Sequence, residues 1–98
     1  MATLYFCVWE DAGMVALGQP IQEGTIAIGG ASAQGAVISG SPRRPRRVRI
    51  FCDVDAFVTW GEDPTAVNDG SDGRPMGSEN PEYWDLEAGH RIAVIERV

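Results

Sequence analysis

The side chains that could carry out catalysis are few in this chain of 98 residues. His90 is the only histidine, and it follows Gly89 in a predicted turn. Nucleophilic catalysis would need a serine or cysteine beside this base and a third group to orient it, and the sequence indicates no such set. Glu62 and Asp63 are adjacent in a predicted loop, whereas glycoside hydrolysis requires two carboxyl groups held a defined distance apart across a sugar cleft. We therefore predict no catalytic residues and no enzymatic activity.

Metal ligands are equally scarce in the sequence. A zinc site takes three or four protein ligands, and the lone histidine with two distant cysteines does not supply them. Residues 68–73 are rich in oxygen and fit part of the EF-hand pattern if Glu79 takes the last position. Because Pro75 falls inside this loop and nothing flanking it looks helical, we interpret it as a solvated turn whose Asp side chains bond nearby backbone amides. We predict no metal and no cofactor, with calcium binding by this loop as the alternative.

The two cysteines, Cys7 and Cys52, lie in apolar segments that read as strands. Two cysteines do not make a disulfide framework, so we expect buried free thiols that behave as small apolar residues. A single disulfide is the alternative, and it would require the two Cα atoms to approach within about 7 Å.

Charge is distributed unevenly along the chain. The formal net charge is −6, every basic residue is an arginine, and five of the eight arginines lie between Arg43 and Arg49. Residues 50–98 carry three arginines against eleven acidic residues. A general nucleic-acid binder needs several cations on one face, so this balance makes nucleic acid an unlikely partner. The arginine cluster is better suited to an acidic protein surface, including another copy of the chain, with a merely solvated linker as the alternative.

Alternation of apolar and polar residues, interrupted by short turns, predicts an all-β fold of about eight short strands. We expect one domain over residues 1–98, a small antiparallel β-sandwich or barrel of the jelly-roll or Ig-like kind, with a Pro/Arg-rich linker at 41–47. Residues 3–9 are apolar on both faces, which predicts a strand that is buried on both sides or covered by a partner. The predicted strands cover residues 3–9, 14–17, 25–28, 35–39, 48–52, 56–60, 81–86 and 91–98.

The run from Gly24 to Gly40 contains no charged residue. A neutral strip of this kind fits the centre of a subunit interface, where charges are depleted, although a half-buried hairpin is the equally weighted alternative. The start of the chain has no basic region and no long apolar run, so we expect no signal peptide, no membrane span and a product that stays in the cytoplasm. The predicted interface residues are Arg43, Arg44, Arg46, Arg47, Ile26, Ile28, Val37 and Ile38.

Residues 48–95 resemble small proteins encoded in the structural-gene modules of tailed bacteriophages. The matching segments are Val48-Arg49-Ile50, Asp55-Ala56-Phe57-Val58, the Gly61-Glu62-Asp63-Pro64-Thr65-Ala66 loop, the Pro81-Glu82-Tyr83-Trp84 turn and residues 88–95. The resemblance implies a virion component, most often a capsid decoration or cement protein with a β-sandwich. It further implies synthesis in the host cytoplasm without secretion, and binding to the major capsid protein or another virion protein.

From the charge polarity and this resemblance we expect a homo-oligomer, with a trimer as one arrangement, whose copies stabilise the assembled shell. A neck or tail component of the virion is an alternative position on the particle. An alternative of a different class is a carbohydrate-binding β-sandwich module that uses Trp60 and Trp84. An exposed aromatic platform would favour that alternative, and burial of both rings would oppose it.

Overall fold

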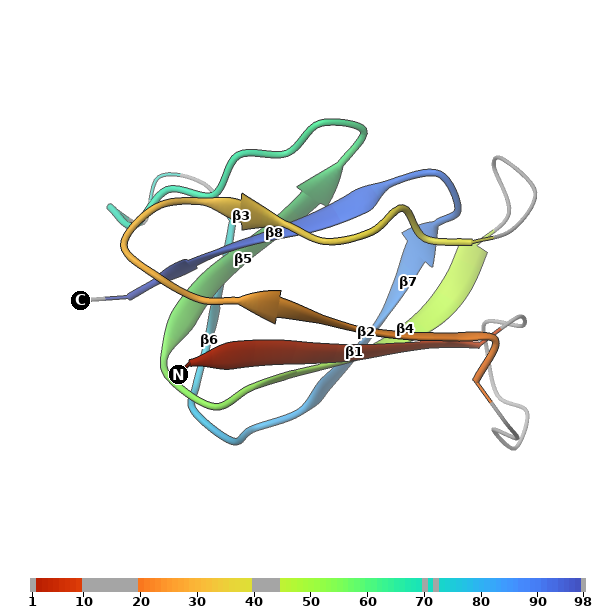
Figure 1. Cartoon of the computed structure of the whole chain (residues 1–98), viewed down its shortest axis with the longest axis horizontal. Coiled ribbons are helices and arrows are strands. Elements are labelled where there is room, and N and C mark those ends of the chain that lie inside the picture. Colours follow the sequence, from red (N-terminus) through yellow and green to blue (C-terminus); the bar gives the residue numbers. More distant parts are fainter. Residues whose placement is uncertain (1, 10–19, 40–44, 70, 72, 98) are drawn as a thin grey trace.

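The computed structural model describes residues 2–9, 20–39, 45–69, 71 and 73–97. The strands in these residues are β1 (Thr3–Trp9), β2 (Gln22–Ala27), β3 (Ala33–Gln34), β4 (Pro45–Cys52), β5 (Ala56–Gly61), β6 (Arg74–Met76), β7 (Glu82–Glu87) and β8 (Arg91–Glu96). They form two four-stranded antiparallel sheets that pack as a β-sandwich (Figure 1). Sheet A has the order β2-β1-β4-β7, and sheet B has the order β3-β8-β5-β6. The predicted all-β sandwich is confirmed. None of the described residues belongs to a helix long and apolar enough to cross a membrane.

The core lies between the two sheets because each central strand alternates its side chains between two faces. In β1, Leu4, Phe6 and Val8 point inward and are almost completely buried, and the intervening residues point outward. Each such apolar side chain contributes roughly 1.5–3 kcal/mol when it leaves water. The inward-facing residues that form this core are Leu4, Phe6, Val8, Ile26, Ile28, Ile38, Val48, Ile50, Cys52, Ala56, Val58, Met76, Leu86, Ile92 and Val94.

A glycine in β2 makes room for the largest side chain of the core. Gly24 is the cross-strand neighbour of Phe6, and a Cβ atom built on Gly24 would lie 2.5 Å from Cζ of the Phe6 ring. No real side chain could be accommodated at that distance without movement of the ring. The edge strand therefore lies directly against the aromatic ring of its neighbour.

Strand β4 begins earlier than the sequence predicted. Pro45 pairs with Glu87 and Arg46 with Leu86, so residues 45–47 belong to sheet A and the predicted linker at 41–47 is wrong for these three residues. Proline is tolerated at the first position of a strand, where its missing N–H costs little. Residues 41–44 lie outside the described residues, as does the strand predicted at 14–17.

The predicted strand at 35–39 is also wrong, because the regular strand in this region is the two-residue β3. The segment that follows still tracks β8, since Gly35 N donates to Ile92 O and Ile38 N donates to His90 O, but with irregular spacing. The short strand β6 was not predicted at all. Its three residues, Arg-Pro-Met, show no alternation that would mark a strand, and their position is set by pairing with β5.

Part of the outer face of sheet B is covered by a loop of the chain. The loop at residues 62–69 follows β5 and runs along the top of the sandwich (Figure 1), where Ala66 packs with Phe57, Ala93 and Ile95. These contacts make a second, smaller apolar cluster outside the main core. Both faces of β8 are consequently buried.

Candidate functional site

The outer face of sheet A carries an exposed aromatic surface. Tyr5 and Tyr83 are 45% and 51% exposed, and Phe51 lies beside Tyr5 with a ring-centroid distance of 6.1 Å. Trp9 lies 6.4 Å from Tyr83 in the same way. A shallow hollow of about 640 Å³ opens over this surface, between Tyr5 and Phe51 on one side and β2 on the other. We refer to Tyr5, Cys7, Trp9, Arg49, Phe51 and Tyr83 as the aromatic face.

Charges on the aromatic face are arranged on opposite sides of β1. Cys7 has Glu23 of β2 as its neighbour on one side and Arg49 of β4 on the other. The Arg49 guanidinium lies over the Phe51 ring, 5.6 Å from its centroid, in a cation–π contact. Burial, followed by the negative charge of Glu23 and its hydrogen bond, raises the pKa of the Cys7 thiol. The aromatic face therefore has the negative charge of Glu23 on one side of β1 and the positive charge of Arg49 on the other.

The described part of the arginine cluster lies on strand β4 instead of in a linker. Arg46 is only 5% exposed, and Arg47 Nε donates to Asp85 Oδ1 at 2.7 Å across the strand pair. Arg43 and Arg44 lie outside the described residues. Assignment of Arg46 to an accessible interface is therefore wrong, whereas the interface role of Arg47 stays a prediction.

The apolar residues predicted for the interface also lie elsewhere. Ile26, Ile28 and Ile38 fill the core and are nearly inaccessible, so their predicted role as contact residues is wrong for this domain. Val37 alone remains exposed, at 40%. The alternation of residues 25–28 was correct, but sequence alone did not reveal which of the two faces points to the core.

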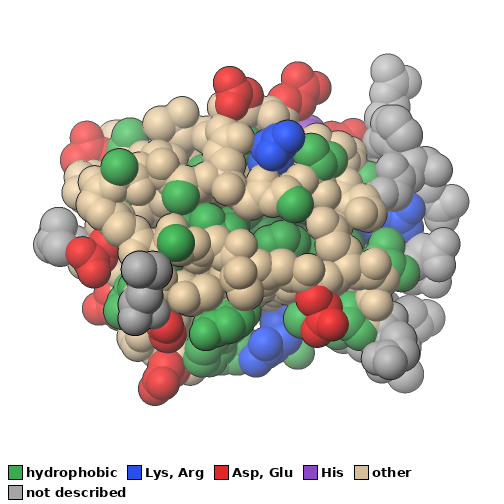
Figure 2. All heavy atoms as spheres, viewed as in Figure 1, with side chains coloured by type: hydrophobic (Ala, Val, Ile, Leu, Met, Phe, Trp, Pro, Cys, Tyr) green, Lys and Arg blue, Asp and Glu red, His purple; other side chains and the backbone are tan. Residues whose placement is uncertain are grey.

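The neutral strip from residue 24 onward lies at the edge where β2 and β3 bring the two sheets together. Figure 2 shows that the middle of this side is largely neutral, with most charged side chains toward its margins. Gln22 links β2 to the segment that follows β3, because its Nε2 donates to Val37 O and its Oε1 accepts from Ser39 N. The described part of the segment is half-buried, but the expected hairpin is wrong, because β2 belongs to sheet A and β3 to sheet B.

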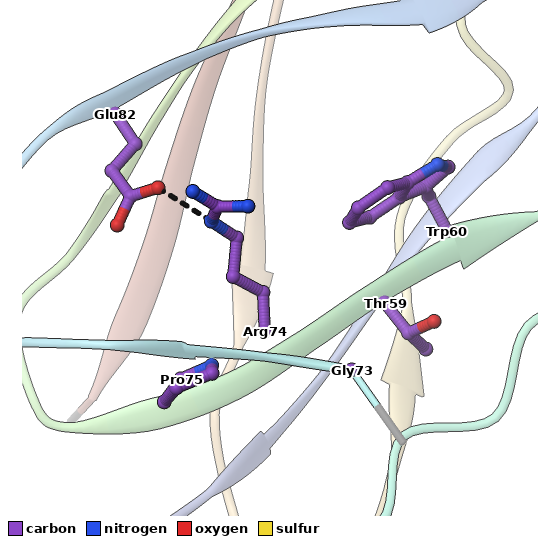
Figure 3. A pocket seen from close by; sticks show the side chains of 6 residues that line it. All are labelled: Thr59, Trp60, Gly73, Arg74, Pro75 and Glu82. Atoms are coloured by element: carbon purple, nitrogen blue, oxygen red, sulfur yellow. Dashed lines mark hydrogen bonds and ion pairs between the residues drawn. The ribbon is translucent and has the colours of Figure 1, made fainter.

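The opposite edge of the sandwich is open. A hollow of about 760 Å³ lies between β5 and β6 of sheet B and β7 of sheet A, lined by Thr59, Trp60, Gly73, Arg74, Pro75 and Glu82 (Figure 3). Trp60 remains 40% exposed, and its ring lies 4.7 Å from that of Trp84, tilted by 46°. We call this site the edge groove.

Polar groups of the edge groove hold one another in place. Glu82 Oε1 accepts two hydrogen bonds, from Arg74 Nε at 2.8 Å and from Trp84 Nε1 at 3.0 Å. The Arg74 guanidinium also lies over the Trp84 ring at 5.5 Å from its centroid. The sequence pointed to both tryptophans, but Arg74 and Glu82 were missed because they are eight residues apart and meet only through the sheet packing.

The remaining candidates for chemistry have local partners. His90 Nε2 lies 3.3 Å from Glu87 Oε2 at the turn between β7 and β8, and Asp63 accepts a hydrogen bond from Gln34 Nε2. Asp69 Oδ1 accepts from both the backbone and the hydroxyl of Ser71, and these bonds lower the pKa of Asp69. Across the described ranges, no three His, Cys, Asp or Glu side chains come close enough together to hold a metal ion.

Both cysteines are free thiols in this structure. Cys52 is completely buried in the core, and burial, followed by the charges of Asp53 and Glu82, raises its pKa to about 12. Cys7 lies on the outward side of β1 and is half-buried. The expected buried thiol is therefore found at Cys52, whereas Cys7 belongs to the aromatic face.

Comparisons with known proteins add no relative: no protein-family model, no curated protein and no solved structure matches this chain significantly.

Proposed function

We propose that this domain is a non-enzymatic structural subunit that associates with a second copy of itself through the aromatic face. The observation that carries the proposal is the difference in exposure between the outer faces of the two sheets. The loop at residues 62–69 covers Ala93 and Ile95 on the outer face of sheet B, whereas Tyr5 and Tyr83 stay exposed on sheet A. Exposed aromatic clusters on small proteins commonly mark sites of protein contact.

Charge complementarity favours a second copy as the occupant of this face. Glu23 and Arg49 flank β1 on opposite sides, with Cys7 between them. A two-fold axis that runs along β1 between two stacked sheets would bring Glu23 of one copy opposite Arg49 of the other, and the reverse. A two-fold interface is self-complementary in this way, and matched charges fix its register.

The size of the face implies a weak contact for a single pair. Strands about 4.8 Å apart and six residues long at about 3.4 Å per residue give a face roughly 20 Å on each side. A standard interface buries about 800 Å² on each partner, so we expect micromolar rather than nanomolar dissociation. Weak contacts of this kind suffice when many copies act together on a lattice, because the copies bind with avidity.

We infer from the sequence resemblance that the lattice is the particle of a tailed bacteriophage, with this domain as a capsid decoration or cement protein. Copies that bind the assembled shell better than free shell subunits stabilise the shell by mass action. The major capsid protein is then the further partner, and a neck or tail location remains the alternative within the same class. Mass spectrometry of purified particles tests this assignment, and absence of the protein from them would refute it.

Sedimentation velocity at increasing protein concentration tests the self-association. Arg49→Glu and Glu23→Arg should each weaken association at least about tenfold, because each places like charges in contact. The double variant Glu23→Arg/Arg49→Glu should recover most of the loss, and Val37→Ser, an exposed residue elsewhere, should change nothing. A wild-type protein that stays monomeric at high concentration, or a double variant without recovery, would refute the role of the aromatic face.

A further inference from the structure

The edge groove combines an aromatic surface with a fixed polar pair, and this combination is unrelated to the aromatic face on the outside of sheet A. Figure 3 shows the Trp60 ring and the Arg74–Glu82 pair around the same hollow. Trp60 comes from β5, Arg74 from β6 and Glu82 from β7, so both sheets contribute. We propose that the edge groove binds a pyranose unit of a neutral glycan.

Pre-organisation of the polar groups is the first argument. Glu82 Oε1 is held by both Arg74 Nε and Trp84 Nε1, so the carboxylate cannot rotate without losing two hydrogen bonds. This leaves Glu82 Oε2 as an acceptor and the terminal guanidinium nitrogens of Arg74 as donors for a ligand. One hydroxyl group of a sugar can donate to Glu82 Oε2 while its neighbour accepts from the Arg74 guanidinium. The fixed geometry of this pair lowers the entropic cost of binding.

The aromatic surface supplies the second argument. The Trp60 side chain is 40% exposed beside the Arg74–Glu82 pair, whereas the Trp84 ring is half-buried behind it and carries the Arg74 guanidinium. The C–H-rich face of a pyranose ring is apolar and can stack on an exposed indole, while its hydroxyl groups at the rim reach polar neighbours. The hollow, at about 760 Å³, is large enough for more than one sugar unit.

Charge balance decides among the classes of ligand. Arg74 and Glu82 form an ion pair, with Nε and Oε1 at 2.8 Å, so the polar wall of the groove is neutral as a unit. The whole chain carries a net charge of −6, which disfavours phosphates, sulfates and acidic sugars. A cation would have to compete with Arg74 for the only carboxylate among the groove-lining residues that the structure describes. A neutral polyhydroxylated ligand meets none of these penalties.

Titration with neutral hexasaccharides of glucose and of N-acetylglucosamine, followed by amide and indole NMR signals, tests the proposal. At least one probe should shift the indole signals of Trp60 and Trp84 and the amide signals of residues 59–61 and 73–75, with a dissociation constant of about 0.1–5 mM. Trp60→Ala should weaken binding at least about tenfold through loss of stacking. Glu82→Gln, which keeps the shape of the side chain, should weaken it about three- to tenfold, and this variant keeps the test valid if Trp60→Ala fails to fold.

Tyr83→Ala is the matched control, because Tyr83 lies between Glu82 and Trp84 on the same strand but points to the other face. This variant should retain glycan binding while it weakens self-association, so failure of one proposal can be told apart from failure of the other. No shift with either probe at about 10 mM overturns the glycan site. Equal binding by wild type and Glu82→Gln, or tighter binding of a sulfated glycan than of a neutral one, overturns it as well.

Discussion

The outer faces of the two sheets differ in solvent exposure, although both are produced by the same alternation of side chains along the strands. On sheet B, Ala93 and Ile95 lie under Ala66 of the loop at residues 62–69 and are removed from water. On sheet A, the corresponding outward positions hold Tyr5 and Tyr83, which stay exposed. The small side chains of Ala66 and Ala93 let the loop approach sheet B closely, whereas each tyrosine of sheet A carries a hydroxyl group that can stay hydrated. The difference is the basis for proposing that the outer face of sheet A contacts a second copy of the domain.

The cover over sheet B is held by polar contacts as well as by apolar burial. Ala66 N donates to Ser32 Oγ at 2.8 Å, and Gln34 Nε2 donates to Pro64 O at 2.7 Å. These bonds join the loop to β3 and the residue before it, at the edge of the sheet. The loop is therefore part of the folded domain, and disturbing it should affect stability rather than association.

A buried charge under this loop should produce the largest effect. Ala93 is fully buried, and Ala93→Asp would place a carboxylate where it finds no water, at a cost of about 3 kcal/mol or more in unfolding free energy. Thr25→Asp, on the exposed outer side of sheet A, should cost no more than about 0.5 kcal/mol. Urea unfolding followed by tryptophan fluorescence measures both. Similar losses for the two variants would show that the faces do not differ as described.

The inner side of sheet A should be nearly as sensitive, because Gly24 lies directly against the buried Phe6 ring. Gly24→Ala places a Cβ atom 2.5 Å from the Phe6 ring and should lower the unfolding free energy by about 1–3 kcal/mol. Gly29 has no atom near its Cβ position, so Gly29→Ala should be neutral or slightly stabilising. Thermal unfolding of the two alanine variants gives the answer, and an unchanged melting temperature for Gly24→Ala would contradict the packing.

Loss of one loop tether should have a moderate effect confined to the covered face. Ser32→Ala leaves the partly buried Ala66 N–H without its acceptor, which should cost about 1–2 kcal/mol. Hydrogen exchange should accelerate at Ala66 before it changes in β1. Ser71→Ala, which alters an exposed turn, is the control. Equal acceleration across both sheets would mean that the loop does not open separately from the domain.

The buried thiol of Cys52 should give the smallest effect on stability, and this effect should be seen only at alkaline pH. Because the pKa of Cys52 is raised to about 12, the folded state keeps this proton between pH 9 and 12 while the unfolded state loses it. The stabilisation that comes from the protonated, buried Cys52 thiol is complete below pH 9 and is lost as the pH rises toward 12. Wild type should therefore lose more stability than Cys52→Ala over that range, and parallel pH profiles would contradict it.

Sequence patterns predicted the strands whose pairing is regular. The strand at residues 3–9 was placed at its observed bounds, and those at 56–60, 81–86 and 91–98 fell within one or two residues of β5, β7 and β8. Alternation is a local property, so it survives without knowledge of the fold. Apolar residues on both faces of 3–9 also predicted burial on both sides or cover by a partner; burial on both sides is wrong, because Tyr5 is 45% exposed, and cover by a partner stays a prediction.

Features that depend on contacts between distant segments could not be predicted from the alternation of residues. Pro45 and Arg46 read as a linker because their composition is typical of one, and only pairing with β7 makes them a strand. Likewise Arg74 and Glu82 reach each other only because β6 and β7 belong to different sheets that meet at one edge. Tertiary packing, rather than local propensity, decides these positions.

Two neighbouring residues after β2 hold both extremities of the described chain. Ile28 N donates to Ala2 O, and Glu96 N donates to Gly29 O, so the first and last strands are fastened to the same short segment although they belong to different sheets. The extremities consequently emerge at one pole of the sandwich (Figure 1). A short peptide could join them head to tail, and the resulting ring would restrict the unfolded ensemble without crossing either the tyrosine-bearing side or the tryptophan-lined edge.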